Sequence, residues 1–230
     1  MSRSEPTSWG IERHVGSAGT FHRRDLPDPV RRALWWFEVT APTVALGSTQ
    51  SIDAVDAEAA EAAGVEVVRR RSGGGAMWLA PGTTTWVDVV LPADDPHWVD
   101  DVGRAATWLG RAWVGALGGL GVSDLVLHDG PMVRSAHSGL VCFAGTAPGE
   151  VSLGGRKVVG ISQRRTRRGA RFQCAVLHHW DPRPLVDVLA LPVATRHALT
   201  TDLAGVGVGI GPVEPAAVVA ALLTQLRNDG

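Results

Sequence analysis

Short apolar segments, separated by turns that contain glycine or proline, dominate the hydrophobic pattern of this chain. Such segments, rich in β-branched and aromatic residues, are typical of β-strands. Pro42 separates the first two of them, because a proline cannot donate to a β-ladder. We expect strands over residues 34–40, 43–46, 65–70, 83–91, 139–143, 150–153, 157–163 and 171–177.

Four other segments have the pattern of helices. Residues 54–63 are rich in alanine and glutamate, Ser51 or Asp53 can cap this helix, and Gly64 can end it. Residues 98–117 form a longer predicted helix, because their apolar side chains recur on one stripe. Two further helices are expected over residues 182–190 and 215–227.

Strands joined mostly by hairpins, with helices to one side, predict an α+β fold rather than a doubly wound one. We expect a mixed, mostly antiparallel sheet with flanking helices. A chain of 230 residues with 45% hydrophobic content can bury one substantial core. Residues 1–33 show little periodicity, so we expect an N-terminal extension that packs on a single domain of residues 34–230.

Composition and charge exclude several classes of protein. The formal charge of −1 argues against a nucleic-acid binder, and no apolar run approaches the roughly 18 residues of a membrane helix. Cys142 and Cys174 are too few for a disulfide framework, which favours a cytoplasmic protein with no membrane partner. No metal site is expected, because neighbouring His178 and His179 would point to opposite faces of a strand.

Lys157 is the one lysine among the 22 Lys and Arg residues. Its ammonium is a compact point charge with a shiftable pKa, which arginine cannot copy. Lys157 is therefore the first candidate for a catalytic residue. The alternative is a coding bias that removed the other lysines and left this one by accident.

Three consecutive glycines, residues 73–75, follow a predicted strand directly. Glycine permits a backbone conformation and a close approach of ligand that side chains forbid. Free N–H groups in such a turn can hold phosphate or carboxylate oxygens, and a flanking arginine can clamp them. The alternative interpretation is a tight turn with no ligand.

The glycine run and the lysine segment together resemble a known family. Arg-Arg-Arg-Ser-Gly-Gly-Gly-Ala (residues 69–76), followed by Gly-Arg-Lys-Val-Val-Gly-Ile-Ser-Gln-Arg-Arg (155–165), is similar to the lipoate-protein ligases and octanoyltransferases, relatives of biotin-protein ligases. Thr-Val-Ala-Leu-Gly-Ser-Thr-Gln (43–50) adds to the resemblance, which covers roughly residues 34–191. It implies a single catalytic domain with a biotin/lipoyl ligase-like, class II synthetase-like fold.

The resemblance implies, as our first hypothesis, an ATP-dependent lipoate-protein ligase. Lipoate and ATP, with Mg²⁺ as counter-ion, give an acyl-adenylate, and a lysine of an acceptor lipoyl domain or small lipoyl carrier protein attacks its carbonyl. Lys157 would face the carbonyl oxygen and the α-phosphate as negative charge develops there. The substrate and adenylate are expected to contact Arg70, Ser72, Gly73, Gly74, Gly75, Ala76, Met77, Trp78 and Gly160.

Cys142 supports a second hypothesis without ATP. Its segment, Cys-Phe-Ala-Gly-Thr-Ala-Pro-Gly-Glu, is similar to one in which some octanoyltransferases carry a nucleophilic cysteine. Octanoate would arrive on an acyl carrier protein, pass to Cys142 and then to the acceptor lysine; Lys157 nearby would favour the thiolate. A third hypothesis is an inactive ligand-binding homologue, because Leu79 and Cys174 stand where the family commonly has histidine. Biotin remains an alternative acyl group.

Overall fold

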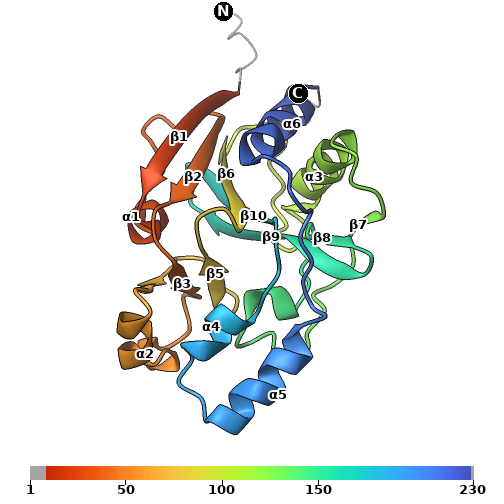
Figure 1. Ribbon diagram of the computed structural model, residues 1–230. Coiled ribbons are helices and arrows are strands. Elements are labelled where there is room, and N and C mark those ends of the chain that lie inside the picture. The colour runs from red at the N-terminus through yellow and green to blue at the C-terminus, as the bar shows by residue number, and fades with distance from the viewer. Residues whose placement is uncertain (1–8, 229–230) are drawn as a thin grey trace, which may run out of the picture.

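The computed structural model describes residues 9–228 and contains a large sheet of seven strands (Figure 1). β1 pairs with β2 in parallel, and the other neighbouring strands pair antiparallel. The prediction of a mixed, mostly antiparallel sheet is therefore confirmed. In spatial order the strands are β1 (Gly10–Gly16), β2 (Ala33–Val39), β6 (Thr84–Pro92), β10 (Gly169–Leu177), β9 (Arg156–Arg165), β8 (Val151–Leu153) and β7 (Leu125–Leu127).

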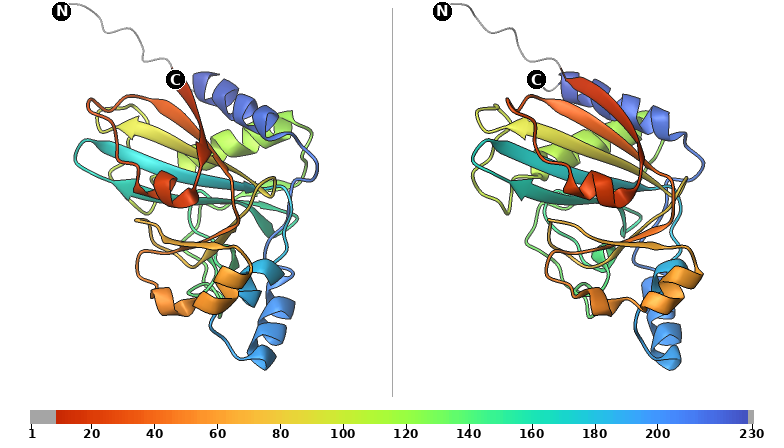
Figure 2. Two further views of the ribbon diagram at one scale, coloured as in Figure 1. Left: turned by 60° about the vertical axis from the view of Figure 1, so that its left-hand side comes forward. Right: turned by 90° about the vertical axis from the view of Figure 1, so that its left-hand side faces the viewer.

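A second sheet of three strands lies across one face of the large sheet (Figure 2). Its middle strand β3 (Thr43–Leu46) is parallel to β4 (Glu66–Arg69) and antiparallel to β5 (Met77–Leu79). Buried apolar side chains from both sheets, including Phe37, Met77 and Trp86, form the core between them. The two sheets thus enclose an apolar layer.

Two helices, α3 (Thr107–Gly119) and α6 (Pro215–Asn228), cover the other face of the large sheet (Figures 1 and 2). They pack on a separate core that contains Trp113 and Cys174. Successive side chains of a strand point to opposite faces, so β10 directs Cys174 toward these helices and Ala175 toward the small sheet. This alternation decides which residues of β10 can meet a ligand.

The remaining helices are short and lie around the small sheet and the N-terminus. Three of them, α2, α4 and α5, form a third core with residues of β3, whereas α1 packs in the core between the two sheets. Helix α2 is capped by the side chain of Asp56, which accepts from the N–H of Ala59. These elements are α1 (Ala18–Arg23), α2 (Ala57–Ala62), α4 (Arg183–Asp187), α5 (Val193–Leu203) and the 3₁₀ turns η1 (Ile52–Ala54) and η2 (Cys142–Ala144).

The largest differences from the predicted elements are two helices that begin later than expected and one expected strand that is absent. The helix expected over residues 98–117 begins at Thr107, because carboxylates such as Asp101 bond nearby N–H groups and favour turns before it. The helix expected from residue 54 begins at Ala57, since Ser51 caps only the 3₁₀ turn η1. The segment 139–143 is no strand: Val141 makes one isolated bridge to Ala76, and η2 follows.

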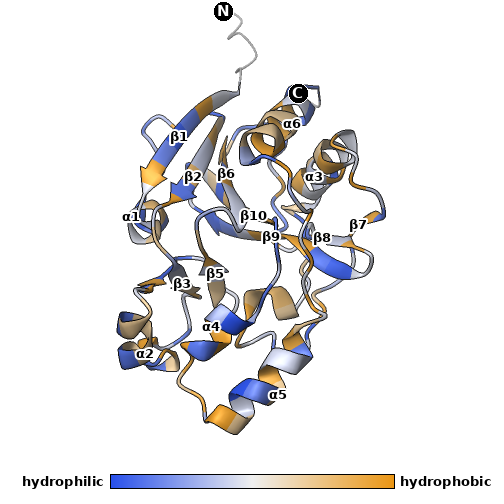
Figure 3. Ribbon diagram, in the orientation of Figure 1, coloured by the Kyte–Doolittle hydropathy of each residue, from blue (hydrophilic) through white to orange (hydrophobic). Residues whose placement is uncertain are grey.

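The N-terminal segment forms strand β1 and helix α1, which its pattern did not predict. β1 is an exposed edge strand whose polar residues interrupt the apolar ones, as Figure 3 shows. Such a strand lacks the run of buried residues that identifies β2, β6 and β10. Helix α5 was also unforeseen. No helix between residues 9 and 228 combines the length and apolar character that crossing a bilayer requires.

Candidate active site

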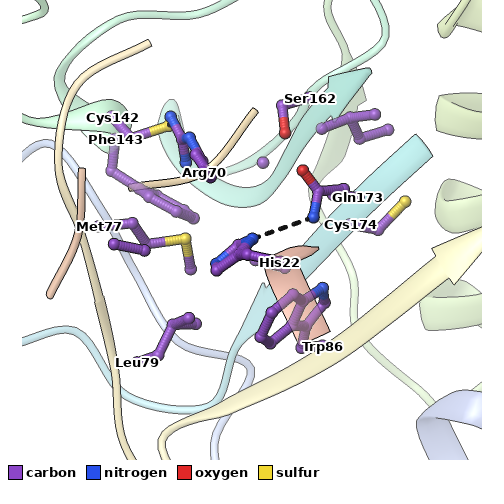
Figure 4. A pocket seen from close by; sticks show the side chains of 14 residues that line it. His22, Arg70, Met77, Leu79, Trp86, Cys142, Phe143, Ser162, Gln173 and Cys174 are labelled. Atoms are coloured by element: carbon purple, nitrogen blue, oxygen red, sulfur yellow. Dashed lines mark hydrogen bonds between the residues drawn. The ribbon is translucent and has the colours of Figure 1, made fainter. Parts of the chain in front are cut away.

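A pocket that is partly open to solvent lies between the two sheets (Figure 4). Residues of the large sheet, the small sheet, α1 and η2 line it together. Its apolar wall is made of Ala45, Met77, Leu79, Trp86, Phe143 and Ala175.

The triple-glycine turn packs tightly against the segment that carries Cys142. Gly74 has a φ of +99°, and a Cβ on Gly75 would lie 2.6 Å from the backbone nitrogen of Val141. Directly after the turn, the N–H of Cys142 donates to the carbonyl of Ala76 at 2.9 Å. Glycine is required here both for the left-handed backbone and for the close approach. The two sequence motifs therefore meet in one site.

Arg70 connects the glycine turn with the thiol of Cys142. Its buried guanidinium donates through Nη2 to the carbonyls of Gly73 at 2.7 Å and Gly75 at 2.9 Å. The same Nη2 lies 3.6 Å from Cys142 Sγ, and the buried Nε has no partner among residues 9–228. A positive charge thus stands beside the sulfur.

The two cysteines occupy different environments. Cys142 is half-buried and lines the cavity, and its sulfur lies beside Arg70 in Figure 4. Cys174 contributes only backbone to that wall, because its side chain packs in the core under α3, and burial raises the pKa of its thiol. The side chain at position 174 points away from the cavity, so cysteine in place of histidine there changes no polar group of the wall. The side chain of Leu79 does lie in the wall, so leucine in place of histidine there makes the wall more apolar.

Lys157 is buried directly behind Cys142, and its three N–H donors all have protein acceptors. Nζ donates to the carbonyls of Cys142 at 2.8 Å and Gly145 at 2.6 Å, and to Glu150 Oε2 at 2.9 Å. Fourteen of the described residues line the cavity, and Lys157 is not among them. The backbone of Cys142 links the ammonium to the residue that follows the glycine turn. The hydrogen bonds of Nζ hold the 142–150 loop in place.

The other residues expected at the site divide between two faces. Met77 lines the cavity, Ser72 donates to the side chain of Gln173 at 2.9 Å, and Gly160 faces the ring of Phe143. Ala76 and Trp78 pack instead in the third core, since neighbouring residues of β5 alternate between faces. Backbone contacts of these two residues with a ligand stay a prediction.

Three polar side chains of the cavity were not foreseen: His22, Ser162 and Gln173. Ser162 and Gln173 interrupt the apolar faces of β9 and β10, and inward-facing polar residues of this kind are a signal in the sequence. His22 had no comparable signal, because the apolar pattern does not predict α1. Burial, with the charges of Arg70 and Arg171, lowers the pKa of His22 to about 3.

The lipoyl protein ligase A/B catalytic domain model matches residues 21–206. The chain belongs to this family. It is 31% identical over 159 residues to octanoyltransferase LipM of Moorella thermoacetica, an alignment that covers 69% of this chain and 54% of that protein. The chain thus spans about half the length of this relative.

Solved structures of the family share the fold. A bi-partite lipoate protein ligase of Thermoplasma acidophilum, described with its E2 lipoyl domain, superposes with a TM-score of 0.74 at 18% identity, over 97% of this chain and 84% of that one. Lipoate-protein ligase A bound with ATP gives a TM-score of 0.69 at 18% identity, over 97% and 85% of the chains. The expected ligase-like architecture is therefore confirmed.

Proposed function

We propose that this protein transfers a medium-chain acyl group, such as octanoyl, to a lysine of an acceptor protein through a thioester on Cys142. The observation that carries the proposal is the thiol of Cys142 at the wall of an apolar cavity, 3.6 Å from the guanidinium of Arg70. The relative named octanoyltransferase supports it. This proposal reverses the order of our two enzymatic hypotheses, because Lys157 has no N–H left for an adenylate.

The proposed reaction has two steps. The thiolate of Cys142 attacks the acyl thioester of a carrier protein, and the carrier leaves as its thiolate, which takes up a proton from solvent. The acceptor lysine, on a lipoyl domain or small lipoyl carrier protein, then attacks the new thioester as a neutral amine, forms an amide and releases Cys142. Arg70 Nε–H, buried without a partner among the described residues, fits the oxygen that becomes negative in both steps.

The apolar wall supports an acyl chain as the group transferred. Each methylene removed from water contributes about 0.8 kcal/mol to binding. Met77, Leu79 and Phe143 offer such a surface next to the thiol. Charged or highly polar acyl groups would lose hydration without replacement in this cavity.

The ATP-dependent ligase remains a second candidate because of the glycine turn. The N–H groups of Gly73, Gly74 and Gly75 donate to no acceptor within residues 9–228, and such a turn is suited to phosphate oxygens. ATP with Mg²⁺ and lipoate would then be the substrates, held by this turn and by Arg70. Pyrophosphate release that depends on lipoate tests this candidate directly.

The test of the proposal is an intact-mass measurement after mixing with octanoyl-carrier protein in the absence of ATP. We expect one acyl adduct on the wild type and on Cys174→Ala, the matched control, and none on Cys142→Ser. Transfer to an acceptor domain should follow the same pattern. An adduct that persists in Cys142→Ser, or its absence from the folded wild type, contradicts the proposal.

A further inference from the structure

Four polar side chains form a directed chain of hydrogen bonds along the cavity wall. Ser162 Oγ donates to Ser72 Oγ at 3.1 Å, and Ser72 Oγ donates to Gln173 Oε1 at 2.9 Å. Gln173 Nε2 then lies 3.2 Å from His22 Nδ1, as the dashed line in Figure 4 marks. An amide nitrogen can only donate, so His22 Nδ1 accepts and the ring proton is on Nε2.

The Nε2–H group of His22 has no acceptor among the described residues, although the side chain is buried and only 6% of the residue is exposed. Buried donors are nearly always paired, and a donor left unpaired weakens the folded state. With a pKa of about 3 the ring stays neutral at physiological pH. Because Nδ1 is already occupied, His22 is a fixed hydrogen-bond donor and is not placed to act as a base.

His22 and Cys142 contact different parts of the cavity wall. The ring of His22 packs on Trp86 of β6 in a tilted arrangement with centroids 4.5 Å apart, whereas Phe143, next to Cys142, packs over Gly160 of β9. Strand β10 lies between β6 and β9 in the large sheet. Figure 4 shows His22 amid the labelled side chains, with Trp86 on one side and Arg70 on the other. Because both residues line the cavity, an acyl chain attached to Cys142 that fills the cavity would pass His22.

We propose that His22 determines substrate specificity by donating from Nε2–H to an oxygen or sulfur acceptor on the acyl chain, beyond the reacting carbonyl. The proposal rests on the acyl-transfer function and deepens it, because the substrate class becomes a functionalised medium-chain acyl group. A plain alkyl chain would leave the donor buried and unpaired. Sites that hydrogen-bond a substrate group discriminate strongly against analogues that lack it.

The test measures binding of free acids by calorimetry, so that its result does not depend on chemistry at Cys142. The ligands are octanoate, an octanoate with a ketone in the distal half of the chain, and lipoate. They are compared on the wild type, on His22→Phe, which keeps the stacking surface, and on His22→Gln, whose amide N–H can take the place of Nε2–H. His22→Met serves as a second apolar variant if His22→Phe fails to fold.

We expect the preference for an acceptor-bearing acid over octanoate to fall about tenfold in His22→Phe, as for one buried hydrogen bond, and to recover in His22→Gln. Loss of preference for the keto acid identifies oxygen as the acceptor, and loss for lipoate identifies sulfur. A preference ratio that is equal in the wild type and both apolar variants overturns the inference. Failure of acylation at Cys142 with an intact His22-dependent preference would overturn the proposed function alone.

Discussion

Lys157 shows why a single lysine occurs in a chain that otherwise uses arginine. Its three N–H groups converge on two carbonyls and one carboxylate within the 142–150 loop. A compact ammonium can satisfy three acceptors around one point, whereas the planar fork of arginine cannot. Glu150 neutralises the charge and also accepts from the N–H of Ala147 and Ile161. The ammonium thereby fixes the position of Cys142.

Lys157→Met is expected to destabilise the protein by about 3–5 kcal/mol, because it leaves the Glu150 carboxylate buried without its partner. Chemical denaturation measures the loss. The double variant Lys157→Met, Glu150→Gln should recover part of it, since no uncompensated charge remains. Equal stability of the single and double variants would contradict the assignment of this pair.

The three glycines are expected to differ in their tolerance of alanine. Gly74→Ala and Gly75→Ala should each lower the free energy of unfolding by at least about 1 kcal/mol: Gly74 has a positive φ, and a Cβ on Gly75 would meet the backbone of Val141 at 2.6 Å. Gly73→Ala is the matched control, because no atom lies within 4 Å of its Cβ position. Denaturation midpoints that fall equally in all three variants would refute this ranking.

Among the elements, α1 depends on tertiary contacts for its existence. A helix of six residues is not stable alone. The buried Arg171 on β10 donates to the carbonyl of Phe21 at 2.7 Å and to that of Arg24 at 2.8 Å, and it pairs with Asp88 on β6. The large sheet thus anchors the C-terminal end of α1 and with it the side chain of His22.

Arg171→Met should release α1 and destabilise the protein by about 3–5 kcal/mol, because Asp88 remains buried without its partner. Hydrogen exchange of the amides of residues 18–23 should accelerate more than that of α3. Arg168→Met is the control: its exposed pair with Asp28 is expected to contribute less than about 1 kcal/mol. Unchanged protection of α1 in Arg171→Met would show that other contacts hold it.

For the whole molecule, His22 makes stability depend on pH. Its pKa is about 3 in the folded state against 6.5 as the reference value, so the unfolded chain binds more protons between these limits. Stability therefore falls as pH decreases from 6.5 toward 3, by about 2–3 kcal/mol at pH 4.5. The charges of Arg70 and Arg171 add to the burial that keeps the ring neutral.

The measurement compares the unfolding free energies of the wild type and His22→Phe between pH 7 and pH 4.5. The wild type should lose about 2–3 kcal/mol more than the variant over this window, since groups common to both chains cancel in the difference. Parallel stability curves would mean that His22 is already protonated in the folded state or is exposed.

At the scale of the chain, the local pattern predicted the elements that carry a run or a stripe of buried apolar side chains. β2, β6, β10 and α6 were expected close to their observed bounds. β1 and α1 were not, because an exposed edge strand and a one-and-a-half-turn helix have too little buried surface to impose a period. Residues 139–143 were apolar for a different reason: they pack under the glycine turn.

The sequence by itself determined the family and the α+β fold, because the glycine run and the lysine segment are local motifs that need no partner to be identified. It also placed Cys142 and Arg70 among the candidates. Only the tertiary structure decided that Arg70 stands beside Cys142, that Glu150 forms an ion pair with Lys157, and that His22 enters the cavity beside Gln173. These pairings join segments from different strands and helices, and the direction of each side chain is set by packing between the two sheets, which no local pattern contains.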